Sequence, residues 1–247
     1  IVQLSIHRQL DAQRPLGFHL SGGLDSSLVA AVSKKLLRTN DFNTFSVVFE
    51  DKTFDESKFA REVASFLGCK HNQLNLNDQM LLERLDEILS SLDEPLADHS
   101  YIPTYLLNEF ASKKVKVVLS GDGGDELFAG YKTYIAHRLF EKVGKIPGLV
   151  PALSVISSWL PPGFEYQSLD WKLKRFFGRS EKNLYRRHLR WMAGTDLPEI
   201  EKMFGFTTQF LDVLLSEFDS ANRGTWLQKL TALDFHFLFS EQRLAES

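Results

Sequence analysis

The sequence of 247 residues predicts an α/β fold: a parallel sheet of the five-stranded type with helices on both faces, followed by a mainly helical part. Two observations predict it. Between residues 15 and 130, short apolar runs typical of strands alternate with stretches of helical apolar spacing, an order that favours parallel strands joined by helices. After Tyr131 the strand signals stop and helical patterns continue. We therefore predict an α/β core over 1–135 and a helical extension packed on it over 136–247.

The individual elements rest on apolar spacing and on residues that begin or end helices. From Ser26 the apolar residues recur at helical spacing. Gly68 suits a helix end and Pro103 a helix start. In order, we predict a helix over 1–10, a strand over 17–20, a helix from 26, a strand over 44–49, a helix ending at 68, a strand over 74–76, helices over 80–92 and from 103, and a strand over 115–119.

Composition limits the partners of this chain. With 29 Lys and Arg against 32 Asp and Glu, the net charge of −3 gives no electrostatic footprint for nucleic acid. Basic residues between 172 and 190 open an RNA-binding interpretation, but their helical spacing favours a solvated helix face. No apolar run is long enough for a membrane span. The single cysteine, Cys69, excludes an internal disulfide and fits a cytoplasmic protein. We expect neither nucleic acid nor a membrane as a partner.

The stretch "FHLSGGLDSSLVAA", residues 18–31, predicts a phosphate-binding turn between a strand and a helix. The first amides of a helix have no partner within it, and two glycines let an anion approach the backbone closely. Hydroxyl groups add further donors. Asp25 would repel phosphate unless a divalent cation lies between them, so it predicts bound Mg²⁺. The alternative is an ordinary strand-to-helix turn, in which glycine, serine and aspartate are common.

A second stretch, "SGDGGDELFAGY" at residues 120–131, follows the strand that ends at Leu119 and has the same organisation. Ligands of parallel sheets bind outside the carboxyl ends of the strands, so both turns are expected to face one crevice. We predict that Asp25 and Asp125 hold one cation against a polyphosphate there.

Together, "LSGGLDSS" and "VVLSGDGGDELFAGY" closely resemble the synthetase domain of the asparagine synthetase family, and "DEPLADHSYIPTYLL" extends the resemblance. It implies a PP-loop ATP pyrophosphatase with the fold of the adenine nucleotide alpha hydrolases. It also implies an activity: such a domain adenylates a carboxylate, usually that of aspartate, releases pyrophosphate, and lets ammonia displace AMP to form an amide.

The resemblance further implies roles for individual residues. ATP and Mg²⁺ are the expected cofactors, and Asp122 is the expected catalytic acid, at a position often held by Glu in the family. Its alternative is a plain turn residue. The residues expected to bind the nucleotide are Leu20, Ser21, Gly22, Gly23, Asp25, Ser26, Val47, Ser120 and Gly121, and those expected to bind the metal are Asp25 and Asp125.

Three departures from the family pattern leave alternatives open. No glutaminase domain is present, so ammonia is expected from a domain outside this chain, which we expect to be part of a longer protein. His99 stands near the place of an arginine, which puts aspartate as the substrate in doubt. The family's lysine-bearing loop is missing between Leu238 and Glu241, either lost or left out of this sequence, and we favour the second. A lactam-forming or other adenylating PP-loop enzyme, a non-catalytic nucleotide-binding module and a homodimer stay open.

Overall fold

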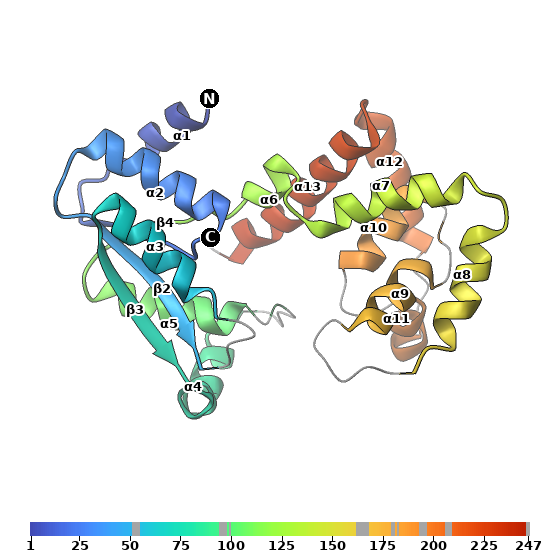
Figure 1. Cartoon of the computed structure of the whole chain (residues 1–247), viewed down its shortest axis with the longest axis horizontal. Coiled ribbons are helices and arrows are strands. Elements are labelled where there is room, and N and C mark those ends of the chain that lie inside the picture. Colours follow the sequence, from blue (N-terminus) through green and yellow to red (C-terminus); the bar gives the residue numbers. More distant parts are fainter. Residues whose placement is uncertain are drawn as a thin grey trace. The chain divides into compact units, whose positions relative to one another are not determined.

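The computed structural model describes residues 1–50, 55–93, 98, 100–161, 168–178, 181, 183–192, 197–205 and 209–245 (Figure 1). The chain divides into two compact units, Ile1–Asp122 and Gly123–Ser247. The first unit carries the sheet and the second is helical. Among the helices described, none is both long and apolar enough to cross a membrane.

The sheet of the first unit is parallel throughout and has the strand order β3-β2-β1-β4. Its strands are β1 (Leu16–His19), β2 (Asn43–Phe49), β3 (Lys70–Leu76) and β4 (Val117–Leu119). The predicted α/β class with a parallel sheet is confirmed. Over the described residues the sheet has four strands where the sequence indicated five, since two helices in succession separate β3 from β4.

Helices cover both faces of this sheet. The helices of this unit are α1 (Val2–Gln9), α2 (Leu24–Leu37), α3 (Ser57–Leu67), α4 (Asp78–Ser90) and α5 (Tyr101–Ser112). Phe18 of β1 packs with Ala30 and Ala60, which places α2 and α3 on one face. Phe45 of β2 packs with Leu107, which places α5 on the other. Because successive strand residues point to opposite faces, His19 lies on the α5 side of the sheet.

Local signals explain several helix ends in this unit. Asp55 accepts a hydrogen bond from the Ser57 amide (3.0 Å), just before α3. Gly68 ends α3 with φ of +60°, a left-handed conformation that glycine adopts without strain. The Asn77 side chain accepts from the amide of Met80 (2.8 Å) and so caps α4.

The second unit is built from helices over its described residues, as the sequence predicts. They are α6 (Gly124–Phe128), α7 (Lys132–Gly144), α8 (Leu149–Ser158), α9 (Leu169–Phe177), α10 (Leu184–Met192), α11 (Leu197–Phe204), α12 (Gln209–Ala221) and α13 (Trp226–Ala245). A cluster containing Tyr134, Tyr185, Leu215 and Leu230 joins α7, α10, α12 and α13. Helix α13 includes residues 238–241, where the family resemblance leads us to expect a lysine-bearing loop.

A buried hydrogen-bond chain crosses the second unit and links Arg187, His137, His188, Asp234 and Tyr134. The Arg187 guanidinium donates to Nδ1 of His137 (3.3 Å), and Nε2 of His137 lies 3.1 Å from Nδ1 of His188. Nε2 of His188 lies 2.8 Å from the Asp234 carboxylate, which also accepts from the Tyr134 hydroxyl (2.5 Å). All five residues are buried.

The donors and acceptors of the buried hydrogen-bond chain fix both histidine tautomers. Arginine only donates, so Nδ1 of His137 accepts and its proton is on Nε2. Nδ1 of His188 then accepts that proton, and Nε2 of His188 donates to the carboxylate. Burial, followed by the charges of His188 and Arg187, lowers the pKa of His137 to about 3, so this ring is neutral. The prediction that the basic residues of 172–190 form a solvated face is wrong for Arg187, which is buried and donates to His137 and to the Glu181 carbonyl.

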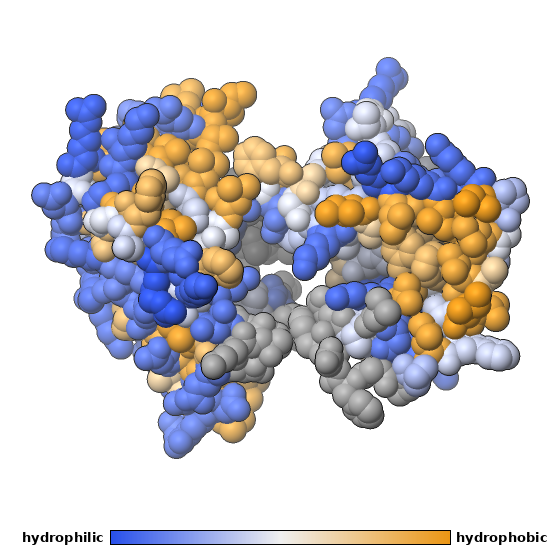
Figure 2. Space-filling view, in the orientation of Figure 1, coloured by the Kyte–Doolittle hydropathy of each residue, from blue (hydrophilic) through white to orange (hydrophobic). Residues whose placement is uncertain are grey.

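Apolar side chains remain exposed on both units. Figure 2 shows apolar surface over α2 in the first unit and over α7 and α8 in the second. The large exposed apolar residues of these helices are Leu24, Leu28 and Leu37 in α2, Ile135 and Leu139 in α7, and Val155 and Ile156 in α8. These faces are only partly covered by the described residues.

Candidate functional site

The first loop, residues 20–27, leaves the carboxyl end of β1 and enters α2. Gly22 has φ of +86°, and a Cβ atom there would lie 2.5 Å from the backbone of Phe59 and Ala60, so only glycine fits. Gly23 is the N-cap of α2, and no side chain caps this helix start. The first amides of α2 are therefore left for a ligand or solvent, and the helix dipole favours an anion there.

Hydroxyl groups of the first loop gather beside this uncapped helix start. Ser21 Oγ and Ser26 Oγ lie 2.9 Å apart, Ser21 Oγ accepts from the Gly23 amide (3.2 Å), and Ser26 Oγ donates to the Gly23 carbonyl (3.3 Å). Ser27 Oγ is buried and has no hydrogen-bond partner among the described residues. A buried hydroxyl without a partner costs about 1–3 kcal/mol, and an anion bound at the loop would supply one.

The second loop, residues 120–123, follows β4 and touches the first loop. Strands β1 and β4 pair in parallel, with Phe18 opposite Leu119, so the two loops leave the same edge of the sheet. A Cβ atom on Gly121 would lie 2.6 Å from the Ser26 amide nitrogen and 3.0 Å from the Asp25 carbonyl carbon. The backbone of the second loop therefore lies directly against the first turn of α2, where the anion is expected.

This close approach makes Gly121 sensitive to substitution. We expect Gly121→Ala to destabilise the first unit by about 1–3 kcal/mol, because the neighbouring atoms are backbone and cannot move aside cheaply. We also expect weaker nucleotide binding, because the loops must separate. Urea unfolding and calorimetry with ATP measure the two effects.

Gly144 provides the control, since a Cβ atom there meets nothing within 4 Å. Gly144→Ala should change neither stability nor nucleotide affinity appreciably. Equal behaviour of the two variants would show that the loops do not need their close contact.

Leu20 and Val47, both expected to bind the nucleotide, lie on different parts of the sheet. Leu20 is buried in the apolar cluster beneath α2 and α3, and its amide donates to the Phe45 carbonyl (2.9 Å). Val47 packs with the cluster on the α5 face. The first unit thus keeps both residues near the strand ends but does not bring their side chains into one cluster.

The second loop orients Asp122. Ser120 Oγ donates to Asp122 Oδ2 (2.6 Å), and the Asp122 amide approaches Ser120 Oγ at 3.4 Å. The Asp122 carboxylate is exposed, and its charge acts on the half-buried His19 of β1. Burial lowers the pKa of His19, and Asp122 partly opposes that effect. The first-loop motif does not single out His19. Its position directly before that loop is the sequence signal that could have identified it.

The two residues expected to bind metal belong to different units. Asp25 is half-buried in the first turn of α2. Asp125 lies in the first turn of α6, and its carboxylate lies against Gly130 of the same motif. Among the described residues, no group of three or more His, Cys, Asp or Glu gathers as a metal centre would require.

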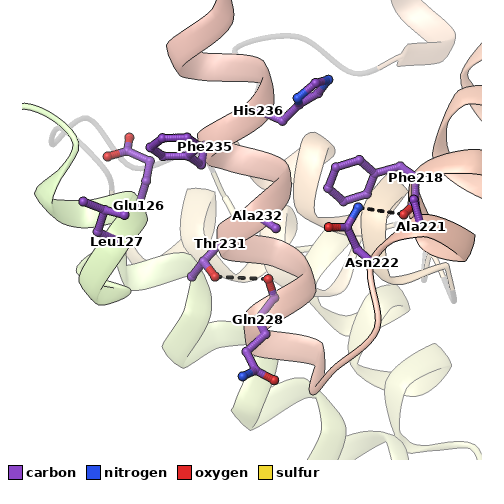
Figure 3. A pocket seen from close by; sticks show the side chains of 10 residues that line it. All are labelled: Glu126, Leu127, Phe218, Ala221, Asn222, Gln228, Thr231, Ala232, Phe235 and His236. Carbon is purple, nitrogen blue, oxygen red and sulfur yellow. Dashed lines mark hydrogen bonds between the residues drawn. The ribbon is translucent and has the colours of Figure 1, made fainter.

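The second unit has a separate pocket of about 610 Å³ between α6, α12 and α13 (Figure 3). Glu126, Phe218, Asn222 and Phe235 are among its lining residues. Glu126 is buried and accepts a short hydrogen bond from the Tyr131 hydroxyl. No residue predicted for the site lines this pocket.

Comparison with known proteins finds the same family that the motifs of the two loops resemble. The family model described as asparagine synthase matches residues 1–246, so the chain belongs to the asparagine synthase family. It is 39% identical over 147 residues to a putative glutamine-hydrolysing asparagine synthetase 2 of Methanocaldococcus jannaschii, a match that covers 60% of this chain and 28% of the relative.

Two further relatives show the breadth of the family. Glutamine-hydrolysing asparagine synthetase 1 of Bacillus subtilis is 36% identical over 167 residues, covering 67% of this chain and 26% of the relative. Amidase chyE of Penicillium rubens is 34% identical over 155 residues, covering 57% of this chain and 23% of the relative. The matches span about a quarter of the length of these relatives.

Proposed function

We propose that this chain is the synthetase part of an ATP-dependent, amide-forming ligase. In this reaction a substrate carboxylate attacks the α-phosphate of ATP, pyrophosphate leaves, and ammonia then displaces AMP from the acyl-adenylate. The observation that carries the proposal is the backbone contact between Gly121 and Ser26, which joins two phosphate-type loops at one edge of the sheet. Membership of the asparagine synthase family supports it.

In the proposed site, the first loop binds the pyrophosphate part of the nucleotide. The uncapped amides of α2 and the hydroxyls of Ser21, Ser26 and Ser27 are suitable donors for phosphate oxygens. They would stabilise the negative charge that develops on pyrophosphate as it leaves. Ser120 and Gly121 would hold the nucleotide from the other side, and the backbone near Leu20 and Val47 would flank the adenine.

Magnesium, when bound, would supply positive charge between the phosphates. Asp25 is placed to hold it, since it follows the glycines of the first loop in the first turn of α2. From the sequence alone, we propose that Asp125 binds the same magnesium ion. Asp122, oriented by Ser120, would act on the reacting carboxylate as the acyl-adenylate forms and is consumed.

The substrate and the ammonia source are also proposals. Aspartate or a related amino-acid carboxylate is the proposed acceptor, and a glutaminase domain is the proposed source of ammonia. Two of the relatives are named glutamine-hydrolysing asparagine synthetases and one is named an amidase. His99, which the sequence suggested near the substrate, lies outside the described residues.

A non-catalytic nucleotide-binding module is the second candidate, and one observation favours it. Helix α13 continues through residues 238–241, at the place where the resemblance implies a loop whose lysine stabilises charge on the α-phosphate. Pyrophosphate release distinguishes the two candidates. We expect the full-length protein with ATP, Mg²⁺ and a panel of amino-acid carboxylates to release pyrophosphate and AMP with at least one of them. Binding of ATP without release for any carboxylate would favour the module.

Substitution of Asp25 tests the magnesium assignment. We expect Asp25→Ala to weaken binding of ATP in the presence of Mg²⁺ by about tenfold or more, equivalent to about 1.4 kcal/mol. Without Mg²⁺ the variant and the wild type should bind ATP similarly, because the role of the carboxylate is to hold the cation. Calorimetry with and without Mg²⁺ measures this.

Asp78→Ala is the matched control, because Asp78 is also an acidic residue in a first helical turn, that of α4. Both substitutions lose the same favourable interaction with a helix dipole. If Asp78→Ala weakens ATP binding as much as Asp25→Ala, the metal role of Asp25 is wrong.

A further inference from the structure

His19 is the last residue of β1 and immediately precedes the first loop. The last pair between β1 and β4 joins Phe18 to Leu119, so one step further along the strands His19 is level with Ser120. Ser120 in turn holds Asp122 through a hydrogen bond of 2.6 Å. His19 therefore lies at the carboxyl edge of the sheet, beside the loop that carries the proposed catalytic carboxylate.

The imidazole of His19 has a nitrogen with no assigned partner. Its Nε2 atom is buried and makes no hydrogen bond to any described residue. The other polar side chains of the two loop starts are engaged: Ser21 with Ser26, and Ser120 with Asp122. A buried nitrogen without a hydrogen-bond partner costs about 1–3 kcal/mol of stability. A ligand or water that forms a hydrogen bond to it would remove this cost, so His19 is available for a role in the reaction.

The surroundings of His19 suit a proton acceptor. Burial holds its pKa below the ordinary value of 6.5, so the ring is neutral near neutral pH. Asp122 is the charged group that acts on the ring among the described residues, and a nearby carboxylate stabilises an imidazolium once it forms. A neutral imidazole beside a carboxylate that stabilises its protonated form is suited to general base catalysis.

We propose that His19 is a further catalytic residue, the base that accepts a proton from ammonia as ammonia displaces AMP. This inference rests on the proposed function. The ammonia nitrogen forms a bond to the acyl carbon, the bond from that carbon to the AMP oxygen breaks, and AMP leaves with its electron pair. One N–H proton passes to the imidazole of His19, and Asp122 stabilises the resulting positive charge.

The experiment measures the two half-reactions separately in the full-length protein. Pyrophosphate release reports adenylation, and amide formation from ammonia in a single turnover reports the second step. We expect His19→Asn to leave pyrophosphate release nearly unchanged and to slow amide formation about 10²–10⁴-fold, the usual contribution of a general base. In His19→Ala, added imidazole should restore part of the amide formation.

The pH dependence gives a second readout. At a constant concentration of free-base ammonia, wild-type amide formation should fall as the pH decreases through the pKa of His19, below 6.5, because the protonated ring cannot accept a proton. His19→Asn should lack this decrease. His71→Asn is the matched control: His71 is also half-buried with a lowered pKa, but both ring nitrogens have partners, Thr44 Oγ1 (2.9 Å) and Ser46 Oγ (3.2 Å).

The outcomes are distinct. Equal loss of both half-reactions in His19→Asn, or a decrease at low pH that persists in this variant, overturns the base role of His19. If neither the wild type nor the variant releases pyrophosphate with any carboxylate, the proposed function itself is overturned. This inference then falls with it.

Discussion

Replacement of Asp234 by alanine is expected to destabilise the second unit by about 2–5 kcal/mol, because two buried donors lose their acceptor and each such group costs about 1–3 kcal/mol. Asp234 receives hydrogen bonds from His188 and Tyr134, and all three residues are buried. Without the carboxylate, the donors of His188 and Tyr134 remain buried without this acceptor. Hydrogen exchange measured on peptides from α7, α10 and α13 should show the loss, while peptides from the sheet should not.

A surface pair in the same unit serves as the control. Asp212 is exposed and pairs with Arg186 at 2.5 Å, so Asp212→Ala should cost at most about 1 kcal/mol. Asp234→Asn keeps the shape and one acceptor oxygen, and we expect an intermediate loss. If Asp234→Ala and Asp212→Ala destabilise the unit equally, the buried hydrogen-bond chain does not carry the stability assigned to it.

Replacement of Asp122 by alanine is expected to reduce amide synthesis from free ammonia about 10²–10³-fold, the range seen when a group that stabilises transition-state charge is removed. The affinity for ATP should change little, because the proposed action of Asp122 is on the acyl-adenylate and not on the bound nucleotide. Steady-state amide formation and calorimetry with ATP and Mg²⁺ measure the two quantities on the same protein.

Ser120→Ala separates the carboxylate from its orientation. This variant keeps Asp122 but removes the hydrogen bond of 2.6 Å that holds it, so we expect a smaller loss of turnover than in Asp122→Ala. An Asp122→Ala variant that binds ATP poorly, yet turns over normally once saturated, would contradict the catalytic assignment and favour a role in nucleotide binding.

The fold of the first unit could be predicted because its sequence signals are local. The apolar run at 115–119 corresponds to β4, Gly68 ends α3, and the glycine-rich turns follow β1 and β4. Parallel pairing of these strands then brings the two loops to one edge, which follows from topology alone. The number of strands was harder, because the predicted sheet was of the five-stranded type and the described sheet has four.

Other features depend on contacts between distant residues and could not be predicted. The helical spacing of the basic residues in α10 indicated a solvated face, yet Arg187 is buried, since His137 of α7 and the ring of Phe140 receive its guanidinium. His19 gave no periodic signal, and its unpartnered nitrogen becomes visible only with the packing of the sheet around it. Leu20 begins the first loop and Val47 lies in β2, the strand beside β1, but their side chains belong to different apolar clusters.

The pairing of β1 with β4 also has a consequence for how the protein folds. Gly17 lies opposite Val118, so these partners are separated by 118 − 17 = 101 positions along the chain. Closing so long a loop has an entropic cost that is recovered only when the strands pair, and such non-local contacts form slowly. The close contact of Gly121 with Ser26 needs this pairing, so a growing polypeptide gains the site only after residue 121 has been synthesised and β4 has joined the sheet.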